Sequence, residues 1–183
     1  MTRPTKTDRA AILAAAMKQV ETEGADKLAI RSVAAMLGLA PNALYHYFDS
    51  LAALQGALAE ESRRLLLEKM EKAAGRKGPA EALRAIAEAY IRFAREHSEI
   101  FSLTLKPSDD DPYEDAAHLR SWQFVLGQVG RLYGEERAPE AALVLWAFLH
   151  GMTVLQQAGV FGKLKPESSF KVGLQMWIDA AAC

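Results

Sequence analysis

The sequence is poor in the residues that build disulfide-linked, fibrous or β-rich proteins. Its single cysteine, Cys183, cannot form a disulfide within the chain, so we expect a reducing, cytoplasmic environment. The 12 glycines and 7 prolines are too few and too scattered for a collagen-like or low-complexity chain. Alternation of polar and apolar residues, the pattern of strands, is nearly absent, and Ala, Leu, Glu, Lys and Arg heavily outnumber β-branched residues. These absences predict an all-α protein.

An excess of charge of one sign is also missing. The 22 Lys and Arg residues oppose 23 Asp and Glu residues, for a net charge of −1, so the whole-chain charge indicates neither a nucleic acid nor a membrane partner. Any basic surface must therefore be local. With 50% hydrophobic and 25% charged residues over 183 positions, the chain is expected to be globular, with one ordinary domain or a small domain joined to a larger one.

Two segments superficially resemble membrane signals. Residues 1–17 place three basic residues before an alanine-rich stretch, but that stretch has eight residues and continues as an amphipathic helix. The run from Ala141 to Gly162 has no formal charge and is long enough to span a bilayer, but His150 and two glutamines interrupt it. We therefore expect no membrane partner.

Prolines and glycines separate segments of helical length, and no predicted helix has to carry an internal proline. Thr7 is the expected N-cap of the first helix and Ser50 that of the fourth. Asp111, Pro112 and Glu114 form a capping-box pattern at the start of the seventh. We predict nine helices, over about residues 8–23, 30–37, 41–47, 51–74, 80–96, 99–105, 111–133, 139–158 and 166–183.

Residues 30–48 have the pattern of a helix-turn-helix. Gly38 supplies the sharp turn, and Ala34 is small where two helices would cross. The predicted inward residues are Val33, Ala34, Leu37, Leu39, Leu44 and Phe48. The predicted outward residues of the second helix are Pro41, Asn42, Ala43, Tyr45, His46 and Tyr47. Two exposed tyrosines and an asparagine at a helix start suit phosphates and base edges, and Arg31 on the preceding helix can reach the same ligand. Packing of Tyr45 on the first helix, and solvation of Arg31, remain the alternatives.

With these residues the segment resembles the DNA-binding domain of the TetR family of transcriptional repressors, and the match extends from about Asp8 to Leu58. Further on, the stretch from Tyr90 to His97 is similar to the fifth and sixth helices of many members, and Trp146 with His150-Gly151 resembles one subgroup. The resemblance implies a helix-turn-helix domain over 1–50 and an effector-binding and dimerisation domain over 51–183. It also implies a homodimer that binds palindromic double-stranded DNA and is released by a small effector.

Two positions depart from the family pattern. Ala40 stands where Ser or Thr usually caps the recognition helix, and loss of that cap oxygen costs about 1 kcal/mol. Leu51 stands where a lysine usually contacts phosphate. Residues 1–50 carry six basic and five acidic side chains, so modest non-specific affinity is expected, with Arg3, Lys6 and Arg9 compensating.

The rest of the chain offers weaker signals. Large apolar side chains with a few polar groups between Tyr90 and Phe124 predict a site for an apolar or aromatic effector, although such residues are more often plain core. The candidates are Tyr90, Phe93, Phe101, His118, Trp122 and Met152. The uncharged run from Ala141 to Gly162, followed by an apolar last helix, predicts a homodimer formed by the last two helices.

Three alternatives compete with a DNA-binding regulator. Asp111, Asp115 and His118 recur at helical spacing and could hold a metal, but acidic residues at a helix start complement its dipole without one. An enzyme centred on His118 or His150 lacks a nucleophile or paired carboxylate, so we expect no enzyme and no cofactor. A close helix crossing at Ala147 and Gly151 explains His150 better. A helical adaptor that binds only protein stays the second candidate.

Overall fold

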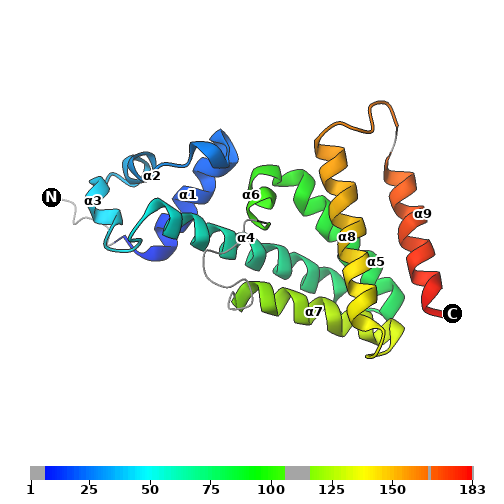
Figure 1. Cartoon of the computed structure of the whole chain (residues 1–183). Coiled ribbons are helices and arrows are strands. Elements are labelled where there is room, and N and C mark those ends of the chain that lie inside the picture. The colour runs from blue at the N-terminus through cyan, green and yellow to red at the C-terminus, as the bar shows by residue number, and fades with distance from the viewer. Residues whose placement is uncertain (1–6, 106–115, 165, 183) are drawn as a thin grey trace. The chain divides into compact units, whose positions relative to one another are not determined.

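Helices account for the architecture of the chain. The computed structural model describes residues 7–105, 116–164 and 166–182, and no strand occurs among them (Figure 1). Within these described residues, the predicted all-α class with nine α-helices is confirmed. The helices are α1 Arg9–Glu23, α2 Ile30–Met36, α3 Pro41–Leu44, α4 Leu51–Ala74, α5 Pro79–Glu96, α6 Ser98–Leu103, α7 Ala116–Tyr133, α8 Ala138–Gln157 and α9 Pro166–Asp179. Two 3₁₀-helices, η1 Ala25–Lys27 and η2 Ala180–Ala182, were not predicted.

Helix boundaries follow local capping chemistry. Ser50 accepts a hydrogen bond from the Ala53 amide at 3.0 Å, which confirms it as the cap of α4. The prediction for α1 was wrong by one residue: Asp8, and not Thr7, is the N-cap, because its carboxylate accepts from the Ala11 amide at 2.8 Å. The α-helical part of α3 ends at Leu44, and a turn replaces the predicted helix over 45–47. The predicted capping box at 111–114 lies outside the described residues.

The chain divides into two compact units. The first holds the described residues up to Arg63 together with those from His97 to Leu105; the second holds the described residues of 64–96 and from Ala116 onward. Helix α6 therefore belongs with α1, although in sequence it follows α5. Two contacts attach it there: Glu99 accepts from the Ala25 amide at 3.3 Å, and His97 Nδ1 lies 2.9 Å from Glu21. A domain boundary at residue 50 stays a prediction.

In the first unit, the core lies where α1, α2 and α3 meet. Helix α2 contacts both α1 and α3, and these helices together with the start of α4 bury the apolar residues that the helical period places on one face. The fully buried side chains include Ile12, Val20, Val33, Leu44, Leu54 and Leu58. This core holds the helix-turn-helix in place.

In the second unit, α5, α7, α8 and α9 pack around a second core. Phe148 of α8 stacks on Phe170 of α9, with ring centroids 5.9 Å apart. The predicted close helix crossing at Ala147 and Gly151 was wrong for the single chain: Ala147 is exposed, and a Cβ built on Gly151 would meet no atom of the described residues within 4 Å. The close approach occurs at Gly173 instead, where a Cβ would lie 2.6 Å from Phe148 Cζ.

Much apolar surface of the second unit is not covered by the residues that the structure describes. By length and composition, α8 is long and apolar enough to cross a membrane. Core helices of soluble proteins have the same length and composition, so this is weak evidence for a membrane span. Its inner face is buried, whereas its outer face is open. The exposed large apolar residues of α8 and α9 are Leu143, Val144, Trp146, Val154, Leu155, Val172 and Met176.

Candidate nucleic-acid interface

The turn between α2 and α3 is built around Gly38. Its φ of 67° lies in the left-handed region, where a side chain would be strained. The Gly38 amide donates to the Ala35 carbonyl at 3.1 Å, and the Leu39 amide donates to the Ala34 carbonyl at 2.9 Å. This pair of bonds is a Schellman motif, which satisfies the last carbonyls of α2 and redirects the chain into α3. The predicted turn glycine is confirmed.

The side chains predicted to hold the two helices together are buried. Val33, Ala34 and Leu44 have no exposed surface, and Phe48 is almost completely covered. Leu37 and Leu39 are half-buried at the turn. These buried contacts hold one face of α3 against the core of the first unit. The opposite face of α3 is therefore exposed to solvent.

Most residues predicted to contact DNA are exposed. Tyr45 exposes 48% of its surface and Tyr47 38%, and Ala43 alone among the seven is half-buried. The exposed set is Arg31, Pro41, Asn42, Tyr45, His46 and Tyr47. No hydrogen bond or ion pair joins the side chains of Arg31, Asn42, Tyr45 or His46 to another part of the described chain. These four side chains are free to contact an outside ligand.

Tyr47 is held differently. Its hydroxyl donates to the Thr7 carbonyl at 2.6 Å, and its own carbonyl accepts from the Arg9 guanidinium at 3.3 Å. The same guanidinium lies over the Phe48 ring, 4.4 Å from its centroid. The residue we expected to meet a phosphate thus ties the start of α1 to the end of the α3 turn. Sequence spacing does not reveal this, because the partners are 40 residues apart.

The two departures from the family pattern are visible in the geometry. Ala40 is the N-cap of α3 and supplies no side-chain hydrogen bond, as predicted. Leu51 begins α4 with its side chain 36% exposed. A lysine at this position would reach solvent beside the helix-turn-helix.

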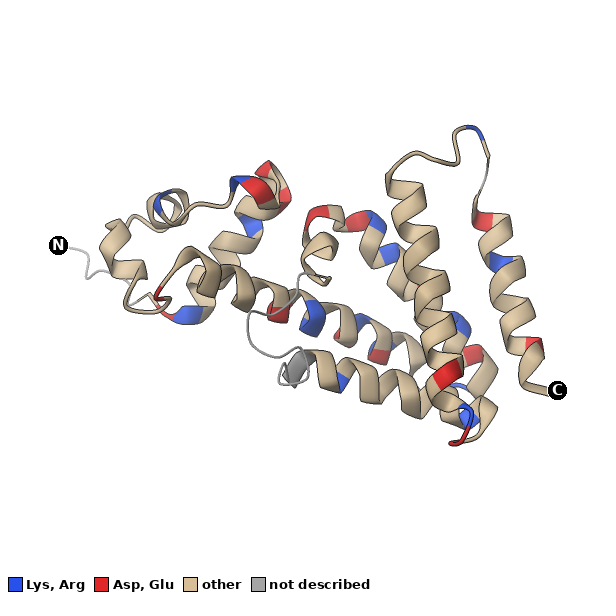
Figure 2. Cartoon of the chain, viewed as in Figure 1, with Lys and Arg blue, Asp and Glu red and all other residues tan. Residues whose placement is uncertain are grey.

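Charge on this part of the molecule is sparse. Helix α3 carries no charged residue, and α2 carries only Arg31 (Figure 2). Arg9 adds a positive charge next to the end of the α3 turn. Arg3 and Lys6, which we expected to compensate, lie outside the described residues. A weak electrostatic contribution to DNA affinity stays a prediction.

The six residues predicted to bind an effector do not share one environment. Phe101 belongs to the first unit and the other five belong to the second. Tyr90 and Phe93 are buried in α5, Trp122 and Met152 are half-buried, and His118 is exposed.

Tyr90 has a hydrogen-bond partner that its sequence neighbourhood does not predict. Its hydroxyl lies 2.8 Å from His150 Nδ1 on α8, and it also bonds to the side chain of Trp146. Burial raises the pKa of Tyr90 far above its usual range, an effect that the bond to Trp146 partly offsets. Burial lowers the pKa of His150, so the imidazole is neutral at pH 7.

The candidate metal site at Asp111, Asp115 and His118 lies largely outside the described residues. Across the parts of the chain that the structure describes, no three His, Cys, Asp or Glu side chains gather closely enough to hold an ion. Asp111 and Asp115 lie outside those parts. His118, the third member of the proposed set, is exposed on α7.

Comparison with known families covers both units. Residues 12–58 match the model of bacterial regulatory proteins of the tetR family. Residues 83–176 match the model of the tetracyclin repressor-like C-terminal domain. Together these two segments contain the helix-turn-helix and more than half of the chain.

Individual relatives agree with these matches. An uncharacterized HTH-type transcriptional regulator of Mycobacterium tuberculosis is 29% identical over 171 residues, which cover 92% of this chain and 78% of that relative. A Rhodococcus protein of unknown function has the same fold with a TM-score of 0.82, at 24% identity over 98% of both chains. A TetR variant from Acinetobacter baumannii in complex with minocycline has a TM-score of 0.68, at 21% identity over 96% of each chain. The chain therefore belongs to the TetR family and is a DNA-binding transcriptional regulator, not an enzyme.

Proposed function

We propose that this regulator is a ligand-responsive repressor that binds a palindromic operator as a homodimer and releases it when a small apolar or aromatic effector binds. The single observation that carries the DNA-binding part is the α2–α3 hairpin. Its anchors Val33, Ala34, Leu44 and Phe48 are buried, while the side chains of Arg31, Asn42, Tyr45 and His46 stay exposed and form no hydrogen bond or ion pair within the described chain. A scaffold that leaves such side chains free suits a surface used for recognition.

Within this proposal the exposed residues divide between two kinds of contact. Asn42 lies in the first turn of α3, where an amide can pair with N6 and N7 of adenine in the major groove. Arg31 and the hydroxyl of Tyr45 suit phosphate oxygens. Pro41, Ala43 and His46 complete the contact set. Tyr47 acts on it indirectly, through the start of α1.

The proposed dimer uses the uncovered faces of α8 and α9. On α8, Leu143, Ala147, Val154 and Leu155 are exposed and recur at helical spacing, with the open Gly151 between them. Exposed apolar surface of this extent indicates an interaction site. A second copy of the chain presents the same face, as a twofold interface requires.

The proposed effector site lies in the second unit, around Tyr90, Phe93, Trp122 and Met152, with His118 at its edge. The Tyr90–His150 hydrogen bond joins α5 to α8 and supplies polar atoms beside these apolar side chains. A drug-sized apolar or aromatic compound suits such a lining. Release of DNA requires that the effector bind one of two arrangements of the dimer more tightly than the other. We place this activity in the cytoplasm and assign it no cofactor.

The experiment that tests the DNA-binding proposal selects bound sequences from random duplex DNA with the purified protein. Enrichment of an inverted repeat, followed by a mobility shift on that repeat, is the expected result. A variant that combines Asn42→Ala with Tyr45→Ala keeps the buried anchors of the helix-turn-helix. It should no longer shift the mobility of this DNA. If the protein enriches no sequence and shifts no DNA at 50 mM salt, the proposal is wrong and the adaptor alternative gains support.

A further inference from the structure

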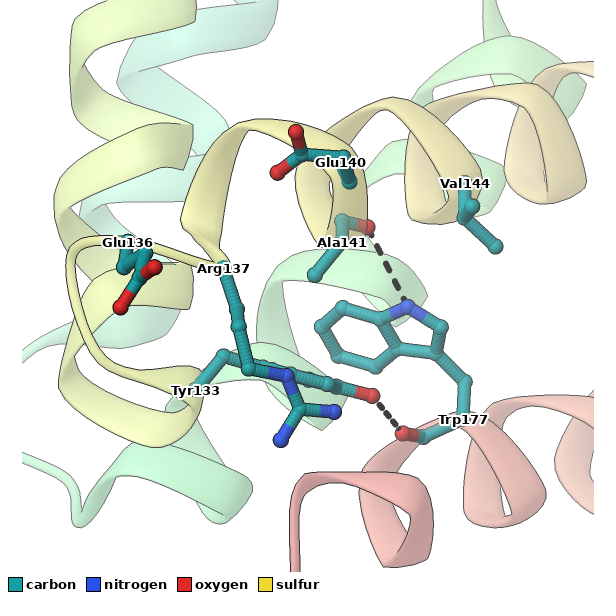
Figure 3. A pocket seen from close by; sticks show the side chains of 7 residues that line it. All are labelled: Tyr133, Glu136, Arg137, Glu140, Ala141, Val144 and Trp177. Atoms are coloured by element: carbon teal, nitrogen blue, oxygen red, sulfur yellow. Dashed lines mark hydrogen bonds between the residues drawn. The ribbon is translucent and has the colours of Figure 1, made fainter. Parts of the chain in front are cut away.

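A hollow lies at one corner of the second unit, apart from the residues proposed to bind the effector. It has a volume of about 510 Å³ and forms where the end of α7, the start of α8 and the end of α9 meet (Figure 3). Tyr133 and Trp177 supply two aromatic rings, and Ala141 and Val144 supply apolar surface. A volume in this range accommodates a drug-sized molecule.

The aromatic part of the hollow is held in place by hydrogen bonds. The Trp177 indole N–H donates to the Ala141 carbonyl at 3.2 Å, and the Tyr133 hydroxyl donates to the Trp177 carbonyl. The two rings lie with their centroids 4.8 Å apart. Since these donors are already used, Trp177 offers a guest mainly the face of its ring, which attracts apolar groups and cations.

The charges around the hollow leave an acidic excess. Arg137 is engaged: its guanidinium lies 5.2 Å from the Tyr133 ring centroid and donates to the Ala180 carbonyl at 3.3 Å. Glu136 and Glu140 also line the hollow, and neither carboxylate has a hydrogen bond or ion pair with the part of the chain that the structure describes. Arg137 thus does not neutralise the two carboxylates, and a cation beside them would.

Acidic residues at a helix start complement the helix dipole, so the two glutamates alone do not indicate a ligand. Their position does, because they line a cavity with the Trp177 ring, and the second ring of that cavity, Tyr133, already holds one cation, the guanidinium of Arg137, against its face. An anion would meet two carboxylates, and a neutral polar molecule would find few free donors.

We propose that this hollow is a second small-molecule site, which binds an organic cation with an aromatic or aliphatic body. The body lies against Trp177, Ala141 and Val144, and the ammonium or amidinium group is directed to Glu136 and Glu140. The site does not depend on the effector site proposed above. Glu140 and Val144 also lie on the exposed side of α8 that the proposed dimer uses, so the hollow borders that interface.

The test uses the full-length protein labelled with ¹⁵N. The chain has three tryptophans, so three indole N–H signals are expected, and Trp177→Phe identifies the one that belongs to Trp177. The probes are 2-phenylethylammonium and 3-phenylpropionate, which share a phenyl ring and carry opposite charges. The cation should shift the Trp177 signal saturably and the anion should not. Raising NaCl from 50 to 500 mM should weaken the cation's binding, because exposed charge pairs are screened.

A pair of variants isolates the carboxylates. Glu136→Gln combined with Glu140→Gln should weaken the cation about two- to fivefold for each lost charge, the range for exposed ion pairs. Glu135→Gln removes an exposed neighbour that does not line the hollow and should leave the affinity unchanged. No saturable shift of Trp177, equal binding of both probes, or equal affinity in the two variants would each overturn the proposal. DNA binding and oligomeric state are measured separately, so those proposals stand or fall independently.

Discussion

At the scale of single residues, the first position of α4 tests how the helix-turn-helix meets the DNA backbone. Leu51 is partly exposed at the first residue of α4. We predict that Leu51→Lys tightens binding to all sequences without changing the preferred one. A new phosphate contact should steepen the plot of log affinity against log salt by about one unit per half-site. Val160→Lys adds the same charge at an exposed position in the second unit and serves as the control. Unchanged affinity and slope for Leu51→Lys would show that residue 51 does not face the backbone.

Substitutions of Asn42 and of Tyr47 should affect DNA binding in different ways. Asn42→Ala is expected to relax the preference at one base pair of each half-site, at a cost of about 1–3 kcal/mol on the best sequence. Tyr47→Phe removes the bond to the Thr7 carbonyl and should weaken all sequences about equally, because the start of α1 is no longer tied to the α3 turn. The measurement is the affinity of both variants for the preferred site and each of its single-base variants. The assignment of Asn42 to a base and of Tyr47 to an indirect role would be contradicted by the reverse result. In that result, Asn42→Ala weakens binding to all sequences equally and Tyr47→Phe changes the preferred bases.

His150 should make the stability of the second unit depend on pH. Burial lowers its pKa below the ordinary 6.5, so the unfolded chain takes up a proton at a pH where the folded protein does not. Stability from this residue is therefore complete above pH 6.5 and falls as the pH drops through the folded pKa. We predict that urea midpoints fall less between pH 7.5 and 5 in His150→Asn than in the native protein. His46→Asn, at an exposed position of the first unit, controls for the loss of one histidine.

At the scale of helices, α8 and α9 pack as closely as Gly173 allows. A Cβ there would lie 2.6 Å and 2.8 Å from two atoms of the Phe148 ring, which cannot move freely because it stacks on Phe170. Overpacking of this kind costs about 1–3 kcal/mol, so Gly173→Ala should lower the free energy of unfolding despite the better helix propensity of alanine. Gly127→Ala, at an exposed position of α7 where a Cβ has open space, is the matched control. Denaturant titration of both variants compares them, and a stabilised Gly173→Ala variant would contradict the packing.

At the scale of the whole molecule, the exposed face of α8 and α9 predicts a homodimer. Val154 is 43% exposed in the single chain and lies on this face. Val154→Glu should bury a charge in the interface and shift sedimentation toward the monomer, with weaker binding to a palindromic site. Gln123→Glu adds the same charge on the exposed side of α7 and should not. A native protein that sediments as a monomer at micromolar concentration would remove the basis for the dimer.

The sequence alone determined the features that depend on neighbours within a few residues. Helical period, the turn at Gly38 and the cap at Ser50 are set by contacts over three to five positions, which is why the nine helices and the helix-turn-helix were predictable. The same locality explains the exposed residues of α3, since four buried anchors leave the opposite side to solvent.

Only the tertiary structure decided which distant residues meet. Tyr47 engages Thr7 across 40 positions, Tyr90 meets His150 across 60, and Trp177 meets Tyr133 across 44. It also assigned α6 to the first unit and moved the close helix approach from Gly151 to Gly173. The physical reason is that periodicity states which face of a helix is apolar, whereas the partner of that face depends on how all helices fill the core at once.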